Sequence, residues 1–246
     1  MNINDTFFDG NYQHGWRQMM PQGLTSVEAD FIFDVAKLQS GDKVLDLMCG
    51  YGRHSFALAR KGVTVTAVDN LAAYIDEIKE KAALDSLSVQ AVCADAAGFE
   101  PEEMYDAAIC MGNSFAFFDK PDALAILKKI AIHLKPGGIF LINSWMVAEV
   151  ALRHFKEKEW NWAGQYQLVL DSKYLLSPSR IETEQTIIAP DGSIEKKTGV
   201  DYIFTLQELA AMAGEAGLNM EAVYGNPKKR PFVLGDGAVY ILLQKQ

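Results

Sequence analysis

Cysteine is scarce in this chain. Among 246 residues there are three cysteines, Cys49, Cys93 and Cys110, each at the end of a predicted strand. An odd number of cysteines cannot pair completely, and their spacing matches no metal-binding pattern. We therefore expect buried free thiols in a reducing compartment, and neither a disulfide framework nor a metal site.

The sequence also lacks long apolar runs and an excess of positive charge. No stretch reaches the length of a membrane-spanning helix, and the first ten residues, MNINDTFFDG, do not resemble a signal peptide. A net charge of −9 argues against a broad nucleic-acid or anionic-membrane surface, although it allows a local basic patch. We therefore predict a cytoplasmic protein and do not expect membranes or nucleic acid as partners.

What is present is typical of one globular α/β domain. The chain is 49% hydrophobic and 22% charged, so it can bury a sizeable core. We treat residues 1–246 as a single domain with room for an elaboration.

The most informative stretch runs from Lys43 to Asn70. It contains an apolar run, a loop with two glycines, a helical pattern, a β-branched run and an acid: 44–48, Gly50 and Gly52, 53–61, 63–68 and Asp69. This order predicts a strand–loop–helix–strand unit, in which the glycines let a ligand approach the backbone. Such units bind nucleoside cofactors at the carboxyl ends of their strands.

Two residues indicate which cofactor this is. Ser55 stands where a dinucleotide fingerprint needs its third glycine, which disfavours a dehydrogenase. Asp46 precedes the loop, where a carboxylate would repel a diphosphate but suit a cationic ligand. S-adenosylmethionine (SAM) carries an ammonium group, a sulfonium group and a ribose. Asp69 can accept hydrogen bonds from the ribose hydroxyls.

The sequence DLMCGYGRH, residues 46–54, resembles motif I of the class I SAM-dependent methyltransferases, and Asp69 falls at that family's ribose-binding acid. The resemblance covers about 25–244 and implies that Asp95 lies against the adenine amino group; the alternative for Asp95 is a helix cap. The SAM-binding residues that it implies are Tyr12, Asp46, Met48, Cys49, Gly50, Gly52, Asp69, Asn70, Asp95, Ala96 and Met111.

The resemblance implies a Rossmann-like sheet of seven strands, with the fourth strand beside the first. Besides the two strands above, extended runs are expected at 87–93, 105–111, 139–142, 218–224 and 238–244. LKPGG, residues 134–138, resembles the turn that precedes strand five. Helix starts are expected at four places: capping boxes at 25–28 and 205–208, and caps at Asn70 and Asp119.

The first 24 residues are aromatic and polar without clear periodicity. In methyltransferases that resemble this chain, such an arm lies over the SAM site as a lid. The other interpretation is that the aromatic residues cover one flank of the sheet, and the sequence leaves both open.

Residues 155–204 predict an antiparallel β insert after strand five. A helix-like segment at 147–158 precedes it, three extended runs follow at 166–175, 180–189 and 194–204, and Pro190-Asp191-Gly192 predicts a hairpin. The insert could roof the substrate with four aromatic residues, or it could pair across a homodimer; we favour the roof. These aromatic residues are Trp160, Trp162, Tyr166 and Tyr174.

The expected function is SAM-dependent methyl transfer to a nitrogen or oxygen of a small molecule. Candidates for a general base are His14 and Tyr166, although the reaction needs one only if the nucleophile arrives protonated. His54 and His133 are expected to serve packing and solvation.

Two alternatives remain open. The same domain could methylate RNA or protein, or it could bind SAM without transferring a methyl group. The basic run 228–230 is by default a solvated loop, and Asn113-Ser114-Phe115 stands where base N-methylating enzymes carry an Asn-Pro-Pro-Tyr type signature.

Overall fold

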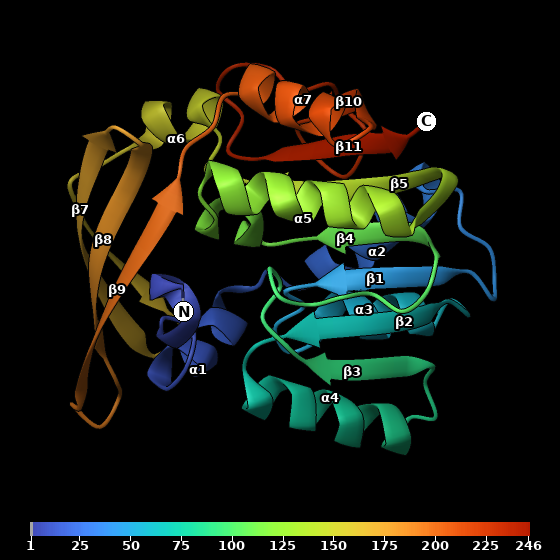
Figure 1. The fold of residues 1–246 in the computed structure, drawn as a ribbon. Coiled ribbons are helices and arrows are strands. Elements are labelled where there is room, and N and C mark those ends of the chain that lie inside the picture. Colours follow the sequence, from blue (N-terminus) through green and yellow to red (C-terminus); the bar gives the residue numbers. More distant parts are fainter. Residues whose placement is uncertain (1) are drawn as a thin grey trace.

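The computed structural model describes residues 2–246 as two sheets with surrounding helices. Met1, the first residue of the predicted arm, lies outside this range. Figure 1 shows a large sheet covered by helices and a smaller sheet beyond the tips of its parallel strands. No helix within residues 2–246 combines the length and the apolar character needed to cross a bilayer.

The large sheet has seven strands in the order β10-β11-β5-β4-β1-β2-β3, which confirms the predicted Rossmann-like architecture. β1 pairs in parallel with β2 and β4, as expected, while β11 is antiparallel to β5 and to β10. The strands are β1 Lys43–Leu47, β2 Thr64–Asp69, β3 Val89–Cys93, β4 Tyr105–Cys110, β5 Leu134–Ser144, β10 Leu218–Tyr224 and β11 Val239–Lys245.

Helices cover both faces of this sheet. Side chains alternate along each strand, so Val44 belongs to one core with Phe31 and Leu58, and Leu45 to another with Ile126 and Met212. The first face carries α2 Leu24–Val35, α3 Arg53–Ala59 and α4 Ala72–Leu84, and the second α5 Lys120–His133 and α7 Leu206–Glu215. Burial on both faces explains the continuous apolar runs of the central strands.

The predicted helix starts are partly correct. Asp119 caps α5, and Thr205 forms a capping box with Glu208 at α7. The box predicted at 25–28 is wrong, because α2 begins after Gly23 without a side-chain cap, and its Glu28 is buried. The cap predicted at Asn70 is also wrong: Leu71 precedes α4, and the Asn70 amide donates to Asp5 instead.

The thiols are not all buried. Cys49 and Cys110 are buried, but Cys93 is exposed. The difference follows from position, because Cys93 ends the strand at the edge of the large sheet.

The insert is a four-stranded antiparallel sheet, one strand more than the sequence predicts. Its strands are β6 Lys158–Ala163, β7 Tyr166–Leu176, β8 Ser179–Ile188 and β9 Ile194–Tyr202. The predicted hairpin joins β8 and β9. The preceding helix, α6 Ala148–His154, ends earlier than predicted. From Lys158 the chain pairs with β7 instead, and no local pattern reveals this pairing.

The arm folds into two short helices, η1 Ile3–Thr6 and α1 Asn11–Met19, and lies between the insert and the large sheet (Figure 1). Its attachment to β9 includes two hydrogen bonds of Asn4: the Asn4 side-chain amide donates to the Val200 carbonyl at 2.8 Å, and its oxygen accepts from the Val200 N–H at 2.8 Å. A Cβ at Gly199 would come within 2.9 Å of Phe7, so the close approach of the arm requires glycine there.

Candidate functional site

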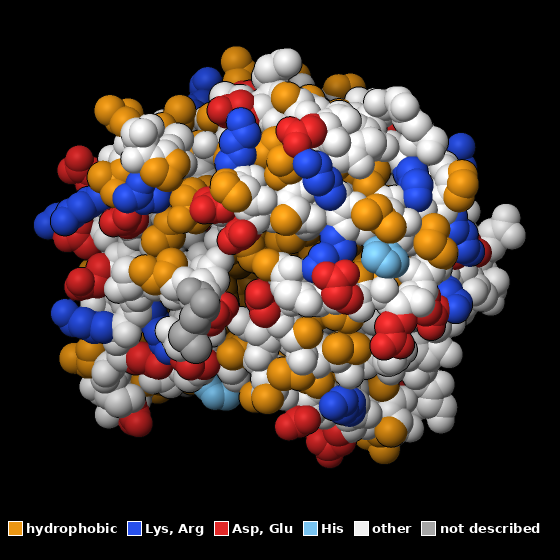
Figure 2. Space-filling view, viewed as in Figure 1, with side chains coloured by type: hydrophobic (Ala, Val, Ile, Leu, Met, Phe, Trp, Pro, Cys, Tyr) orange, Lys and Arg blue, Asp and Glu red, His pale blue; other side chains and the backbone are white. Residues whose placement is uncertain are grey.

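A cavity of about 420 Å³ lies at the carboxyl ends of β1, β2 and β4, where the arm and the insert meet the large sheet. Figure 2 shows a hollow on this side of the molecule, with hydrophobic atoms inside it and acidic side chains near its edge. A volume of this size suits small-molecule ligands. The cavity therefore combines the edge at which parallel sheets bind cofactors with a cover made from two other parts of the chain.

The glycine loop forms one wall of the cavity. Gly50 lines it with a φ of +55°, and a Cβ at this position would meet no protein atom within 4 Å. Gly50 thus leaves open space on the cavity side of the backbone. Gly52, with a φ of +76°, serves packing instead: its Cβ would approach Ile78 to 2.9 Å, and Gly52 does not line the cavity.

Asp69 lies at the end of β2 and faces the loop. Its carboxylate accepts from the N–H groups of Gly50 at 2.8 Å and Leu71 at 3.0 Å. Burial raises its pKa, and these backbone hydrogen bonds counteract part of the rise. A carboxylate has about four acceptor positions, so the fixed Asp69 side chain can still accept from ligand hydroxyls.

Asp46 is buried beneath the same loop. The Ser55 hydroxyl donates to it at 2.5 Å, and burial raises the pKa of the carboxyl group while the nearby His54 and the Ser55 hydrogen bond lower it. A dinucleotide fingerprint has glycine at the position of Ser55. Here the Ser55 hydroxyl supplies a hydrogen bond that the buried Asp46 carboxyl group needs.

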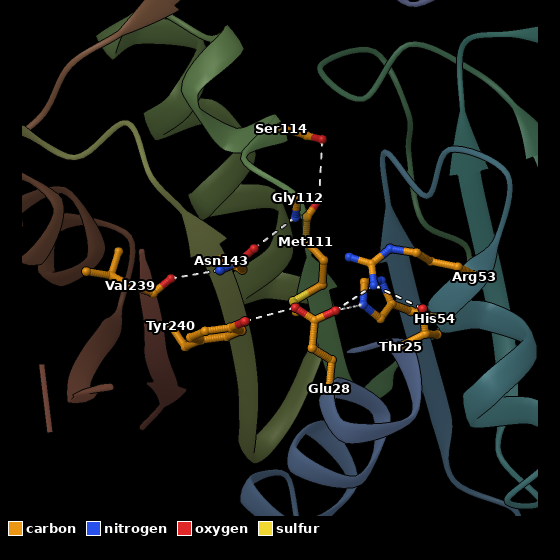
Figure 3. Close-up of polar contacts among 10 residues, drawn as sticks. All are labelled: Thr25, Glu28, Arg53, His54, Met111, Gly112, Ser114, Asn143, Val239 and Tyr240. Carbon is orange, nitrogen blue, oxygen red and sulfur yellow. Dashed lines mark hydrogen bonds and ion pairs between the residues drawn. The ribbon is translucent and has the colours of Figure 1, made fainter. Parts of the chain in front are cut away.

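A second buried acid, Glu28, joins α2, α3 and β11 (Figure 3). Its carboxylate accepts from Arg53 at 2.5 Å, from His54 at 2.9 Å and from the Tyr240 hydroxyl at 2.9 Å. Burial alone would raise the pKa of Glu28, but His54 and Arg53 outweigh it and bring the pKa to about 2. Glu28 is therefore ionised at neutral pH and fixes the Arg53 and His54 side chains that line the cavity.

On the opposite wall, Asn113 and Asp201 connect the large sheet to the insert. The Asn113 oxygen accepts from the Ser144 hydroxyl at 2.7 Å, the Trp145 N–H at 3.2 Å and the Met146 N–H at 3.1 Å. These donors fix the amide orientation, so its NH₂ group donates to Asp201 at 2.9 Å. Burial raises the pKa of Asp201 to about 7, although the Asn113 hydrogen bond lowers it.

Aromatic side chains from the arm and from the ends of β4 and β5 complete the cavity. Tyr12 stacks on Trp16, with ring centroids 6.1 Å apart, and Trp16 lies 6.2 Å from Trp145. Phe8 of the arm packs on Phe117 at 4.8 Å. Burial raises the pKa of the Tyr12 hydroxyl, so Tyr12 is neutral.

The sequence candidates divide into those that line this cavity and those that do not. Ten of the eleven predicted cofactor residues line it: Tyr12, Asp46, Met48, Cys49, Gly50, Asp69, Asn70, Asp95, Ala96 and Met111. Gly52 does not. Nor do the two candidates for a general base, His14 and Tyr166, whose rings stack on each other 6.5 Å apart.

The insert does line the cavity, but the four aromatic residues predicted to roof the substrate are not among the lining residues. Trp160 and Trp162 are 62% and 60% exposed and face away from the cavity. Because side chains alternate along a strand, Asn161 between them faces inward. The residues that the insert contributes to the lining are Asn161, Leu168, Leu170, Thr183, Gln185, Gly199, Val200 and Asp201. A contact between two copies through this sheet stays a prediction.

Sequence reasoning missed Asp201 as part of this region, and it missed the buried network of Glu28 and the pairing of Asn113 with Asp201. Glu28 fits the spacing of a capping box, which concealed its inward position. For Asp201 the available signal was an acid within the apolar run GVDYIF, at the end of a predicted strand. Its partner Asn113 is 88 residues away, so no spacing relates the two.

Comparisons with known proteins agree with this geometry. Residues 44–138 match the family model described as a methyltransferase domain. A cypemycin N-terminal methyltransferase from Streptomyces sp is 29% identical over 216 residues, 84% of either chain. A ubiquinone biosynthesis O-methyltransferase from Idiomarina loihiensis is 34% identical over 188 residues, which cover 68% of this chain and 75% of that protein.

A solved structure shares the whole fold. The structure of an S-adenosylmethionine-dependent methyltransferase from Clostridium acetobutylicum aligns with a TM-score of 0.82 over 96% of both chains, at 16% sequence identity. Similarity at this level of identity shows that the two chains have the same fold.

Proposed function

The chain belongs to the class I SAM-dependent methyltransferases, and from this premise we propose that it transfers the methyl group of SAM to an amine nitrogen of a small-molecule acceptor. SAM is the cofactor of this family. When bound, it supplies an electrophilic methyl group on a sulfonium. Every other contribution comes from residues of the chain.

The residues present fit SAM. The open space at Gly50, which a side chain would fill, gives the cofactor access to the loop backbone. We assign Asp69 to the ribose hydroxyls, Asp95 and Ala96 to the adenine side, and Asp46 to the cationic end of the methionine part. Arg53, held by Glu28 at the cavity wall, is the cation available for the carboxylate of SAM.

The part of the cavity beneath the arm and the insert is the reason for proposing a small, cationic substrate. The arm and the insert cover the cavity, and its wall carries aromatic rings together with the carboxylates of Asp5 and Asp201. Aromatic faces and carboxylates favour an ammonium ion and disfavour a polyanion. This enclosed, acidic and aromatic half is the single observation on which the acceptor class rests.

Two further features support an amine over the alternatives. The name of the Streptomyces relative describes methylation of an amino terminus, and that relative aligns over most of this chain. The basic run near the carboxyl end offers little to a nucleic acid, because Lys229 pairs with Asp34 and Arg230 with Asp236. The Idiomarina relative is named an O-methyltransferase, so oxygen is the alternative to nitrogen as the acceptor atom.

The residues then have three tasks in the transfer. They hold donor and acceptor in line, exclude water from the covered cavity, and remove a proton from an acceptor that arrives as an ammonium ion. Orientation and proximity supply on the order of 7–11 kcal/mol in favourable cases. An in-line displacement needs no covalent intermediate with the protein.

The test is methyl transfer from SAM labelled in its methyl group into a cell extract that is then separated by size. We expect label in the small-molecule fraction, on nitrogen by mass spectrometry, and less label with Asp69→Ala at a limiting concentration of SAM. Asp171→Asn, an exposed change on the outer side of the insert, is the matched control and should behave as wild type. Label in RNA or protein, or SAM binding without any transfer, would contradict the proposal.

A further inference from the structure

We infer that Asp201 of the insert, held in place by Asn113, is the group that binds the ammonium form of the acceptor and takes its proton. This inference rests on the proposed function and adds a catalytic residue from outside the SAM-binding unit. It also narrows the substrate class to amines that are protonated in solution.

The geometry of the pair leaves one side of the carboxylate to the ligand. Asn113 donates to one Asp201 oxygen, and within residues 2–246 no other side-chain hydrogen bond reaches this carboxyl group. Asp201 is partly exposed and lines the cavity, so its second oxygen can be reached from there. Because Asn113 is itself fixed by three donors, the carboxylate has a set direction.

The charges around Asp201 also leave a place for a cation. From the arm, Asp5 and Tyr12 line the same cavity, one an acid and the other neutral. The cavity side chains Arg53 and His54 are bound to Glu28, and Arg180 of the neighbouring strand β8 is bonded to Glu182. On β9 itself, Lys197 pairs with Asp9 and Glu195. Among the described residues, Asp201 thus has no cationic partner, so a ligand that supplies a positive charge would offset the cost of burying part of its carboxylate.

Neighbouring aromatic rings favour the same ligand. Trp145 follows Ser144 at the end of β5; its backbone N–H donates to the Asn113 oxygen, and Trp145 lines the cavity together with Asn113 and Asp201. Trp16 of the arm packs against it. An ammonium ion at Asp201 would therefore meet aromatic faces as well as a carboxylate.

The proton and electron balance is complete without a further reactant. The acceptor R–NH₃⁺ gives one proton to Asp201, which leaves R–NH₂ and a neutral carboxylic acid. The nitrogen lone pair then forms the N–CH₃ bond as the C–S bond breaks, and the sulfur keeps the electron pair of that bond. The methylated product leaves as an ammonium ion, and Asp201 returns its proton to water once the cavity opens.

The acidity of Asp201 suits this role. Burial raises its pKa to about 7, so near neutral pH the group exists in both forms and can accept or release a proton with little cost. Asp46 and Asp69, in contrast, are each bonded to neighbours within the glycine-loop unit.

Calorimetry with a pair of probes tests the inference. Benzylamine and benzyl alcohol have nearly the same shape, but only the amine is protonated at neutral pH. Each is titrated into the protein saturated with S-adenosylhomocysteine, for wild type, Asp201→Asn and the matched control Asp171→Asn. Asp201→Ser is the second variant in case Asp201→Asn melts at a much lower temperature than wild type.

We expect benzylamine to bind wild type at least about tenfold more tightly than benzyl alcohol, because a charge-assisted hydrogen bond is added. The preference should weaken below the Asp201 pKa of about 7, vanish in both Asp201 variants and persist in Asp171→Asn. An equal affinity of wild type for the two probes, or an amine preference that survives Asp201→Asn, would overturn the inference. Failure of S-adenosylhomocysteine to bind wild type would instead remove the proposed function on which the inference rests.

Discussion

The cavity has a cofactor half, formed by the glycine loop with Asp46 and Asp69, and an acceptor half around Asn113 and Asp201. The two halves are held together in different ways. In the cofactor half, the polar contacts are local in the chain: Ser55 bonds to Asp46 nine residues before it, and Gly50 bonds to Asp69 19 residues after it. In the acceptor half they are distant: Asn113 and Asp201 are 88 residues apart, and Asn4 and Val200 are 196 apart. One half is a single strand–loop–helix–strand unit, whereas the other is assembled from three separate segments.

This difference indicates that the two halves can be altered independently. Changes in the local unit should act on cofactor affinity, because its residues face the loop and the end of β2. Changes in the assembled half should act on acceptor affinity and on docking of the arm. The network around Glu28 is the exception, since it joins α2, α3 and β11 beneath both halves.

The largest effect on SAM affinity is expected for Gly50→Val. The side chain would enter the open space on the cavity side of the loop, and a β-branched residue is strained at a φ of +55°. We expect SAM affinity to fall by at least about 100-fold, or more than about 2.7 kcal/mol, with the fold retained. Calorimetry gives the affinity and circular dichroism checks the fold.

Gly192→Val is its matched control. Gly192 has a φ of +83° and equally open surroundings, but it lies in the β8–β9 hairpin away from the cavity. It should show similar backbone strain and unchanged SAM affinity. If both variants lost SAM binding, strain and not the filled space would be the cause.

Glu28→Gln should have the largest effect on the stability of the fold. It leaves Arg53 without its buried counter-ion, which costs about 3–5 kcal/mol. Because the pKa of Glu28 falls from 4.5 to about 2 on folding, its contribution is complete above pH 4.5 and is lost as the pH drops towards 2. Denaturant unfolding should therefore show a wild-type advantage that shrinks over this interval. Glu184→Gln, exposed on the insert, should show almost none.

Asp69→Ala should weaken SAM binding by about 1.5–3 kcal/mol, since it removes charge-assisted hydrogen bonds to the ribose. The amine preference of the acceptor half should be unchanged, which makes this variant a direct test of independence. Calorimetry with SAM gives the first quantity and the benzylamine–benzyl alcohol pair the second. Unchanged SAM affinity would refute the ribose assignment.

Asp201→Asn should stabilise the folded protein at neutral and higher pH, whereas most changes of buried residues destabilise it. The pKa of Asp201 rises from 3.8 to about 7 on folding, so the folded state holds a proton that the unfolded chain releases between these values. Wild-type stability therefore falls as the pH rises through this interval, whereas the amide cannot ionise. We expect the variant to be more stable by about 1–3 kcal/mol above pH 7 and equal below pH 3.8. Parallel curves for the two proteins at all pH values would contradict this.

Asn4→Ala should have the smallest effect. It removes both hydrogen bonds between the arm and Val200, at about 1–2 kcal/mol in total. We expect the KM for the acceptor to rise several-fold through a loosened cover, with SAM affinity nearly unchanged. Asn219→Ala, at an exposed position of β10, is the control. A larger loss of SAM affinity than of acceptor affinity would place the arm over the cofactor, as a lid.

The same difference explains what the sequence could predict. The glycine loop, Asp46 and Asp69 form a short pattern with fixed spacing, so their chemistry can be inferred from the residues alone. The Asn113–Asp201 pair and the arm depend on contacts between distant segments, which spacing does not encode. Trp160 and Trp162 face outward because side chains alternate along β6. The sequence of β6 does not by itself predict a strand, so this alternation could not be foreseen and the expected aromatic roof is wrong.

Attachment of the arm to β9 has a consequence for folding during synthesis. The arm is made well before β9: Val200, its partner, follows 196 residues later, after all of β1 to β5. Until β9 leaves the ribosome, the aromatic residues of the arm lack their final cover and stay exposed to other chains. The glycine-loop unit can close early, whereas the acceptor half is completed among the last contacts of the molecule. A circular permutation that places the arm after residue 246 through a linker would let the arm follow β9 out of the ribosome.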